Sequence, residues 1–406
     1  MQLRDAELAV AVSVVVSLVL ATAAAVAMST PRESEAGAPI VASEPAESPV
    51  AEDDPEDVPE ACEPAPLERR AAQVLVVGLP GVTVSSDPMV GEVLDVGVGG
   101  VLLTGANVET GTQVARLVGE LRARARGPLV VTADEESGRV STFRELFGPG
   151  PSARSLARTR SPAEVRAAAE DLGSDLAALG IDVDLAPVVD LDAGPAYGVI
   201  GDRSFSGDPA TAGTYALAWA RGLAAGGVRP TAKHFPGHGR VTEDTHRQVT
   251  RVDVTVEELT ATDLRPFAAL MDAGVPLVMV DHVVYTDLDL DLPASLAPAA
   301  YQLLREMGFD GVAITDSLGM AAVNLRWSFP EATVMAVAAG ADAVLTTDGR
   351  QARAMRDALV DAVRSGRLDE ERLDEAAGRM VALAEGDTEA LVCRAVTIPA
   401  LSLAAG

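Results

Sequence analysis

Eight short apolar runs, separated by longer segments of helical character, constrain the fold of this 406-residue chain most strongly. The runs are rich in Val, Leu and Ala, which is typical of parallel strands buried on both faces. They cover residues 73–80, 99–105, 128–134, 181–188, 228–235, 276–283, 310–317 and 341–348. This alternation predicts an α/β fold, a single (β/α)8 TIM-like barrel, with an open doubly wound sheet as the alternative.

The segments between the runs have helical signals. Residues 112–125 and 162–180 are the clearest, and the second begins with Ser161 as an N-cap and Pro162 at the first helical position before it ends at Gly180. No GxGxxG follows the first run, and the sequence contains no P-loop. The barrel is therefore favoured over a nucleotide-binding open sheet.

The N-terminal part differs from the rest of the chain. Residues 8–28 form an uncharged apolar run of 21 residues, long enough to span a bilayer at about 1.5 Å per residue. The run fits either a cleaved signal peptide or an uncleaved signal anchor. Residues 29–66 contain 8 prolines and 11 acidic residues, a composition typical of a disordered linker. We expect a targeting segment (1–28), a linker (29–66) and a catalytic domain (67–406).

Charge and cysteine content restrict location and partners. A formal net charge of −28 argues against binding to nucleic acids and to anionic lipid headgroups. We therefore expect no nucleic-acid partner and membrane contact only through the N-terminal segment. We expect an extracytoplasmic protein, secreted or anchored, with a monomeric domain. In that environment Cys62 and Cys393 can form a disulfide, the alternative being two free thiols.

Charged residues gather where several predicted strands end. Because parallel barrel strands finish at the same rim, and barrel active sites lie there, these positions are candidate functional residues. An Asp after a strand also serves as a turn or N-cap residue, but the coincidence at several strand ends favours a site. The residues concerned are Asp134, Lys233, His234, Asp281, His282 and Asp316.

The histidines are concentrated in one segment. Of four in the chain, His234, His238 and His246 fall within KHFPGHGRVTEDTH, and Asp244 lies two residues before His246. A carboxylate near an imidazole orients the ring and stabilises its protonated form. The Asp244–His246 pair is therefore a candidate general acid/base.

Together with GFDGVAITDSLGM, this segment resembles glycoside hydrolase family 3, in its single-domain β-N-acetylhexosaminidase branch. The resemblance extends over most of residues 67–385 and includes LAPVVDL (185–191) and VIGDRSFSGDP (199–209). It implies a retaining β-N-acetylglucosaminidase that needs no cofactor or metal. The implied substrates are peptidoglycan fragments or related oligosaccharides ending in N-acetylglucosamine.

The resemblance also assigns roles by position. Asp316 matches the nucleophile, His246 the acid/base and Asp244 its partner. We expect Lys233 to lie near Asp316 and keep it ionised. Asp134, Arg203, Lys233 and His234 match the contacts to the sugar.

The chain departs from the family pattern after the third run. The family usually has D-Q-E-G-G-R-V where residues 134–140 are DEESGRV, and a second arginine usual before the phenylalanine is Thr142. We therefore expect one sugar contact to be lost or supplied differently. The reaction type is less affected by these changes.

Other functions compete with this interpretation. Only about 60 residues follow the eighth run, too few for the second domain that supplies the acid/base in related two-domain β-glucosidases. A metal-dependent hydrolase is disfavoured because three histidines share one segment and no HxH occurs. A non-catalytic sugar- or wall-binding protein on the same barrel, and transfer to phosphate instead of water, both stay open.

Overall fold

All eight predicted apolar runs form strands of one parallel sheet in the computed structural model, which describes residues 62–242, 244–245 and 247–404. The strand order is β11-β9-β7-β6-β3-β2-β1-β12. The predicted apolar run 8–28 and linker residues 29–61 lie outside the described residues. The strands are β1 Leu75–Gly78, β2 Gly100–Leu103, β3 Val130–Ala133, β6 Val183–Asp184, β7 Arg229–Phe235, β9 Leu277–Val280, β11 Val312–Thr315 and β12 Val344–Thr346.

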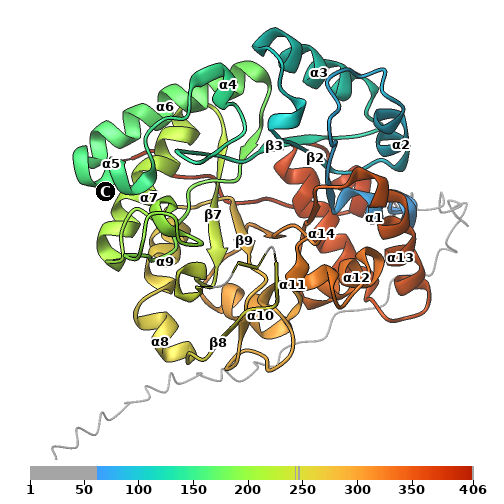
Figure 1. Cartoon of the computed structure of the whole chain (residues 1–406). Coiled ribbons are helices and arrows are strands. Elements are labelled where there is room, and N and C mark those ends of the chain that lie inside the picture. The colour runs from blue at the N-terminus through green and yellow to red at the C-terminus, as the bar shows by residue number, and fades with distance from the viewer. Residues whose placement is uncertain (1–61, 243, 246, 405–406) are drawn as a thin grey trace, which may run out of the picture. The chain divides into compact units, whose positions relative to one another are not determined.

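The sheet closes on itself between β11 and β12. A parallel bridge joins Ile314 to Ala343, and the N–H of Thr315 donates to the carbonyl oxygen of Ala343 at 3.1 Å. Figure 1 shows the strands at the centre with helices around them. The predicted barrel is confirmed, and the open doubly wound alternative is wrong.

The helices follow the strands along the chain. In α6 the hydroxyl of Ser161 accepts from the N–H of Glu164, and Gly180 ends the helix with φ 87°, as the sequence predicted. The helices are α1 Leu67–Gln73, α2 Pro88–Val96, α3 Gly111–Arg124, α4 Arg144–Phe147, α5 Ala153–Thr159, α6 Pro162–Leu179, α7 Pro209–Ala225, α8 Val256–Ala261, α9 Leu264–Asp272, α10 Pro298–Glu306, α11 Ala321–Asn324, α12 Phe329–Ala339, α13 Ala352–Arg364, α14 Glu370–Leu383 and α15 Glu389–Val392.

Apolar side chains fill the barrel interior. They come from alternate positions on the strands, because successive side chains of a strand point to opposite faces. One cluster contains Val76, Leu102, Val130, Val183, Leu185, Leu277, Met279, Val312, Ile314 and Leu345. Its members Leu102, Leu185, Met279 and Leu345 also line the cavity described below, so the core forms the base of the site.

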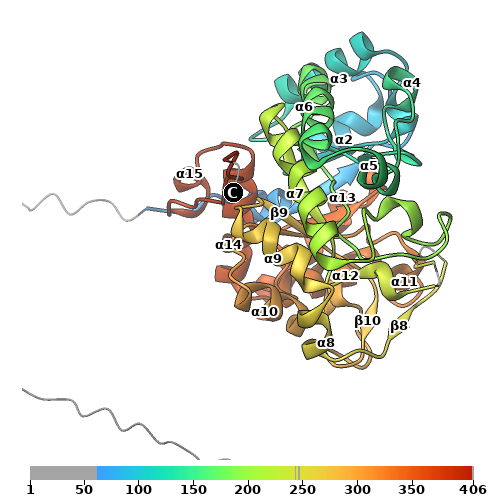
Figure 2. The ribbon, with the colours of Figure 1, turned by 90° about the vertical axis from the view of Figure 1, so that its left-hand side faces the viewer.

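Short elements that the sequence did not predict follow the carboxyl ends of the strands. β4 Glu135–Ser137 and β5 Val140–Ser141 form a hairpin after β3, and β8 Arg251–Val252 pairs in parallel with β10 Val284–Tyr285. In Figure 2, β8, β10 and α11 lie at one end of the barrel, and α15 lies at the other.

The two ends of the domain are tied together. A disulfide joins Cys62 to Cys393, whose Cα atoms are 5.7 Å apart, and the N–H of Ala65 donates to the carbonyl of Leu391 at 3.0 Å. The last residues of the predicted linker are thus attached to the domain. Among the described residues, no helix is both long and apolar enough to cross a membrane.

Candidate active site

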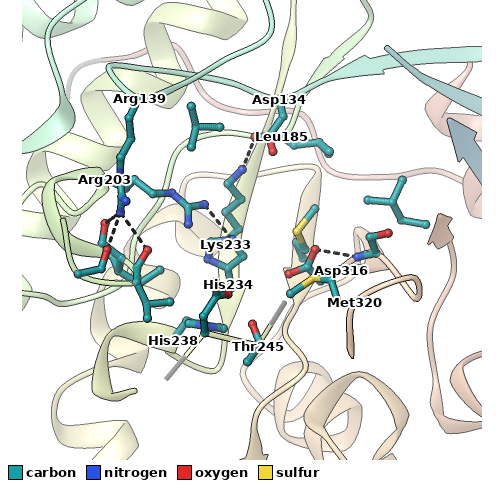
Figure 3. Close-up of a pocket in the computed structure, with 18 of the residues that line it drawn as sticks. Asp134, Arg139, Leu185, Arg203, Lys233, His234, His238, Thr245, Asp316 and Met320 are labelled. Atoms are coloured by element: carbon teal, nitrogen blue, oxygen red, sulfur yellow. Dashed lines mark hydrogen bonds and ion pairs between the residues drawn. The ribbon is translucent and has the colours of Figure 1, made fainter. Parts of the chain in front are cut away.

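A cavity of about 500 Å³ opens at the carboxyl ends of the strands. Figure 3 shows side chains from several strand ends and loops pointing into it. Six of the predicted site residues line it together: Asp134, Arg203, Lys233, His234, Asp244 and Asp316. His246, the predicted acid/base, lies outside the described residues.

Lys233 is the buried cation at the centre of the site. Its side chain extends from β7 and is 1% exposed, and its Nζ lies 2.5 Å from Oδ1 of Asp134 and 2.6 Å from Oε1 of Glu136. Burial lowers the pKa of Lys233, but the two carboxylates outweigh it and raise the pKa above its ordinary value. The ammonium group is therefore charged and fixed.

Glu136 connects Lys233 to Arg203. Nε and one terminal nitrogen of Arg203 each donate to the Glu136 carboxylate at 2.7 Å. Burial raises the pKa of Glu136, but Arg203 and Lys233 together hold it well below its usual range. A bidentate ion pair of this kind fixes the orientation of a guanidinium as well as its position. Glu136 thus places two hydrogen-bond donors in the cavity wall.

Asp190 orients His234. Its carboxylate lies 2.7 Å from Nδ1 of His234, while a terminal nitrogen of Arg203 lies 3.3 Å from the ring's Nε2. These partners fit a ring that donates from Nδ1 and accepts at Nε2. The Asp190 carboxylate also accepts from the N–H of His238 at 2.7 Å, so it fixes the turn after β7 as well.

His238 is a further buried histidine in the cavity wall. Its Nδ1 lies 3.5 Å from Oδ2 of Asp281, beyond ordinary hydrogen-bond distance, and the hydroxyl of Tyr285 lies 2.7 Å from the same oxygen. Burial lowers the pKa of His238, but Asp281 outweighs it, and the pKa lies above its ordinary value.

Asp316 follows β11 and lines the cavity. Its Oδ1 accepts from the N–H of Ser317 at 2.7 Å. Burial raises the pKa of Asp316, but His282, His234, the Ser317 N–H and His238 outweigh it and lower the pKa. The carboxyl group is therefore ionised at neutral pH.

Lys233 lines the same cavity as Asp316 but makes its ion pairs elsewhere, so its expected effect on the ionisation of Asp316 stays a prediction. Lys233 pairs with Asp134 and Glu136, whereas the carboxylate of Asp316 accepts from the N–H of Ser317. In Figure 3 the dashed line from Lys233 ends at Asp134, whereas the dashed line from Asp316 marks its hydrogen bond with the N–H of Ser317. A side chain's position at a strand end could not reveal which of several nearby charges it would meet.

His282 ends the sixth run of the sequence but lies beneath the site. The ring is fully buried, with Nδ1 2.6 Å from the Ser295 hydroxyl and Nε2 2.9 Å from the Ser317 carbonyl. Because the carbonyl can only accept, Nε2 carries the proton and the Ser295 hydroxyl donates to Nδ1. Burial lowers the pKa of His282 accordingly. Its contact with Ser317 fixes the residue that holds Asp316.

The loop after η3 His238–Arg240 supplies another part of the wall. Thr242, Asp244 and Thr245 line the cavity, and the carbonyl of Thr245 accepts from the N–H of Ala322 at 3.1 Å. Asp244 thus lies where the sequence predicted. Its predicted partnership with His246 stays a prediction.

Of the three positions that depart from the family pattern, Glu135, Ser137 and Thr142, the last two have distinct local consequences. Thr142 is buried, and its hydroxyl donates at 2.9 Å to the backbone carbonyl of Asp134, so it closes the β4–β5 hairpin. Ser137 has φ 67°, in the left-handed region that favours the glycine usual there. Its hydroxyl donates to the carbonyl of Pro151 at 2.9 Å, which offsets part of the backbone cost.

Sequence reasoning missed Glu136 and Asp190 as site residues. Both stood in motifs that the sequence resemblance already contained, which was the available signal. Their partners lie far along the chain, however: Glu136 contacts Arg203 and Lys233, and Asp190 contacts His234. Among the described residues, no group of three or more His, Cys, Asp or Glu is arranged to hold a metal ion.

The chain matches known proteins over most of its folded part. Residues 67–383 match the glycosyl hydrolase family 3 N-terminal domain. The chain is 42% identical over 264 residues to the beta-hexosaminidase LpqI of Mycobacterium tuberculosis, covering 63% of this chain and 68% of that protein.

Solved structures agree with this match. A glycosyl hydrolase of the same family from Mycobacterium smegmatis has a TM-score of 0.72 and 39% identity, over 79% of this chain and 97% of that one. A family 3 beta-N-acetylglucosaminidase from a Paenibacillus species has a TM-score of 0.74 and 34% identity, over 82% of this chain and 64% of that one.

The family match and these relatives agree with the barrel and with its cavity of fixed acids, cations and histidines. They identify an enzyme rather than the non-catalytic sugar-binding alternative. The chain belongs to glycoside hydrolase family 3.

Proposed function

We propose that the protein is a retaining β-N-acetylglucosaminidase that removes terminal β-linked N-acetylglucosamine, with Asp316 as its nucleophile. One observation carries the proposal: an ionised carboxylate lines a cavity whose wall also holds fixed hydroxyl-binding groups. The preference for an N-acetylated sugar rests on the relatives, which include a beta-hexosaminidase and a beta-N-acetylglucosaminidase.

The first step forms a covalent intermediate. Oδ1 of Asp316 is occupied by the Ser317 N–H, so Oδ2 is the more available oxygen to attack the anomeric carbon. The bond from that carbon to the leaving oxygen breaks, and this oxygen takes a proton from the general acid. We assign the acid to His246, with Asp244 as its partner. Most such enzymes use a second carboxylate in this place.

The second step returns the enzyme to its starting state. The same histidine, now unprotonated, takes a proton from water, and the water oxygen attacks the anomeric carbon as the bond to Asp316 breaks. Two displacements at one carbon retain the β configuration. The released sugar therefore starts as the β anomer.

The fixed side chains orient the sugar. Lys233 and Arg203 supply donors, and the half-exposed Asp134 carboxylate supplies an acceptor for ring hydroxyls. Because Glu136 and Asp190 hold these groups before substrate arrives, little reorganisation is needed on binding. His234 completes this set.

The cellular setting is part of the same proposal. We infer that the apolar run 8–28 exports the chain, as a signal peptide or an anchor, and that a monomeric domain acts outside the cytoplasm. Peptidoglycan fragments that end in N-acetylglucosamine are the substrates we propose.

The test compares two chromogenic substrates, a β-N-acetylglucosaminide and a β-glucoside, with the parent and with Asp316→Asn. We expect the parent to prefer the N-acetylated substrate and to release the β anomer first, as followed by proton NMR. Asp316→Asn should lose at least about 10³-fold in kcat. Asp95→Asn, an exposed residue on α2, is the control. Release of the α anomer would contradict a retaining mechanism.

A further inference from the structure

Tyr197 lies in the loop between β6 and η2 Gly201–Arg203 and lines the mouth of the active-site cavity. It is 91% exposed, more than any other large hydrophobic residue among those described. Single exposed aromatics are common on protein surfaces and need no explanation by themselves. The position of Tyr197 at the cavity and the rigidity of its loop set it apart.

Asp192 and Arg154 close the base of this loop. The two carboxylate oxygens of Asp192 accept from the N–H groups of Gly194 at 2.5 Å and Gly201 at 2.6 Å. Arg154, on α5, donates to the carbonyls of Gly194 at 2.6 Å and Asp192 at 3.0 Å. The parts of the loop before and after Tyr197 are therefore held at a fixed separation, and Tyr197 does not contribute to these contacts.

Arg139 holds the side of the loop that follows Tyr197. One of its terminal nitrogens lies within hydrogen-bond distance of the carbonyls of Gly198 at 2.8 Å, Val199 at 2.9 Å and Ile200 at 2.6 Å. Within the loop, the N–H of Gly198 donates to the carbonyl of Pro195 at 2.9 Å, which makes a turn with Tyr197 inside it.

The charges around Tyr197 are thus used to hold the backbone. The guanidinium of Arg139 faces carbonyls and pairs with Asp202 at 3.1 Å, and the carboxylate of Asp192 faces N–H groups. What the loop presents to an incoming ligand is the aromatic ring. A tyrosine ring carried on a fixed backbone recognises an uncharged, flat-faced partner better than a charged one, and only two side-chain torsions need to be ordered when it binds.

We propose that Tyr197 is the stacking platform for the second sugar ring of the substrate, the one that leaves after cleavage. This inference rests on the proposed function and adds a specificity-determining residue to it. The terminal sugar occupies the polar interior beside Asp316 and Lys233, so the next pyranose extends toward the mouth. There its C–H face can lie against the exposed ring of Tyr197.

The test uses two substrates that differ only in the leaving group. N,N′-diacetylchitobiose carries a second sugar, whereas N-acetyl-β-glucosaminyl fluoride carries none. Because kcat/KM reports the first displacement, it includes any contact with the leaving group. We expect Tyr197→Ala to lower kcat/KM for the disaccharide about 10-fold, since an aromatic contact is worth roughly that factor. The fluoride should change less than about twofold by the same reasoning.

Two variants serve as controls. Tyr197→Phe keeps the ring and should retain most of the activity on the disaccharide. Leu290→Ala removes another strongly exposed hydrophobic side chain, outside the cavity lining, and should leave kcat/KM for both substrates unchanged. This inference would be overturned if Tyr197→Ala lowered kcat/KM equally for both substrates, or left kcat/KM for the disaccharide unchanged. In either case an active parent enzyme would still support the proposed function. A folded parent inactive on both substrates would overturn both proposals.

Discussion

Two buried clusters of charged side chains lie at opposite ends of the barrel and differ in what surrounds them. At the amino ends of the strands, fully buried Asp342 pairs with Arg305 and Arg372 at 2.6 Å and with Arg379 at 3.0 Å. It also accepts from the N–H of Ala313 at 3.0 Å. Burial raises the pKa of Asp342, but the three arginines outweigh it and lower the pKa.

The active-site cluster has the same kinds of residue. Glu136 is as deeply buried as many core side chains and pairs with Arg203 and Lys233. This cluster, however, borders a cavity of about 500 Å³, and Asp316 and Asp134 keep carboxylate oxygens that face it. Burial and ion pairing therefore do not identify a site. A cavity next to groups with unused hydrogen-bonding capacity does.

The largest difference between the clusters should appear in Asp342→Asn. An amide cannot balance three guanidinium groups, so we expect the free energy of unfolding to fall by about 3 kcal/mol. The kcat/KM of the folded enzyme should stay within about twofold of the parent, because Asp342 lies at the end of the barrel opposite Asp316. Urea unfolding followed by fluorescence, together with the chromogenic assay, measures both quantities.

Asp357→Asn is the matched control for that variant. It also removes a carboxylate that pairs with an arginine, but the Asp357 side chain is 53% exposed, so less than about 1 kcal/mol should be lost. If Asp342→Asn were as stable as this control, the proposed structural role of Asp342 would be wrong.

Glu136→Gln should show the reverse pattern. The amide keeps the size of the side chain but releases Arg203 and Lys233 from their common anchor, so we expect kcat/KM to fall about 100-fold. The loss of stability should be smaller than in Asp342→Asn, because Lys233 still pairs with Asp134. Steady-state kinetics and urea unfolding measure the two effects, with Glu145→Gln on α4 as an exposed control. An unchanged kcat/KM would contradict the account of Glu136.

The smallest expected effect is on the pH dependence of stability. The folded pKa of His238 is raised, mainly by Asp281 against the effect of burial. Its contribution to stability is therefore complete below the unfolded pKa of about 6.5 and is lost as pH rises through the folded pKa. We expect the parent to lose its stability advantage over His238→Gln as the pH rises above about 6.5, as measured by urea unfolding.

His282, which lies beneath the cavity, has a pKa shifted in the opposite direction. Burial lowers its pKa, so its neutral form belongs to the folded state, and stability is lost as pH falls through about 6.5. The stability difference between the parent and His282→Gln should therefore grow as pH rises. Equal slopes for the two histidine variants would mean that their surroundings do not differ as described.

The sequence predicted the barrel well because its strands are buried on both faces and so appear as continuous apolar runs. It also placed Asp134, Lys233, His234 and Asp316 correctly at one rim, since parallel strands share an end. The pairings at that rim were not predictable in the same way. Which cation meets which carboxylate depends on loops such as 192–203, whose course no periodic pattern records.

The ion pairs of Asp342 could not be predicted from the sequence either, because they also join residues that are far apart in the chain. Asp342 is the second residue of the eighth run and belongs to none of the motifs discussed above, although it is as buried and as strongly paired as Glu136. Only the fold shows that its partners come from α10 and α14. Tyr197 was not predicted as a site residue, because neither the exposure of a side chain nor its proximity to a cavity produces a recognisable sequence pattern.

The most direct test of the central claim is to trap the covalent intermediate and locate it. A 5-fluoro derivative of N-acetyl-β-glucosaminyl fluoride slows both steps but retains a good leaving group, so the glycosyl–enzyme should accumulate. Mass spectrometry of the digested protein should then find one sugar, attached to the peptide that contains Asp316. A sugar on a different carboxylate, or turnover with no covalent adduct, would contradict the assignment of Asp316 as the nucleophile.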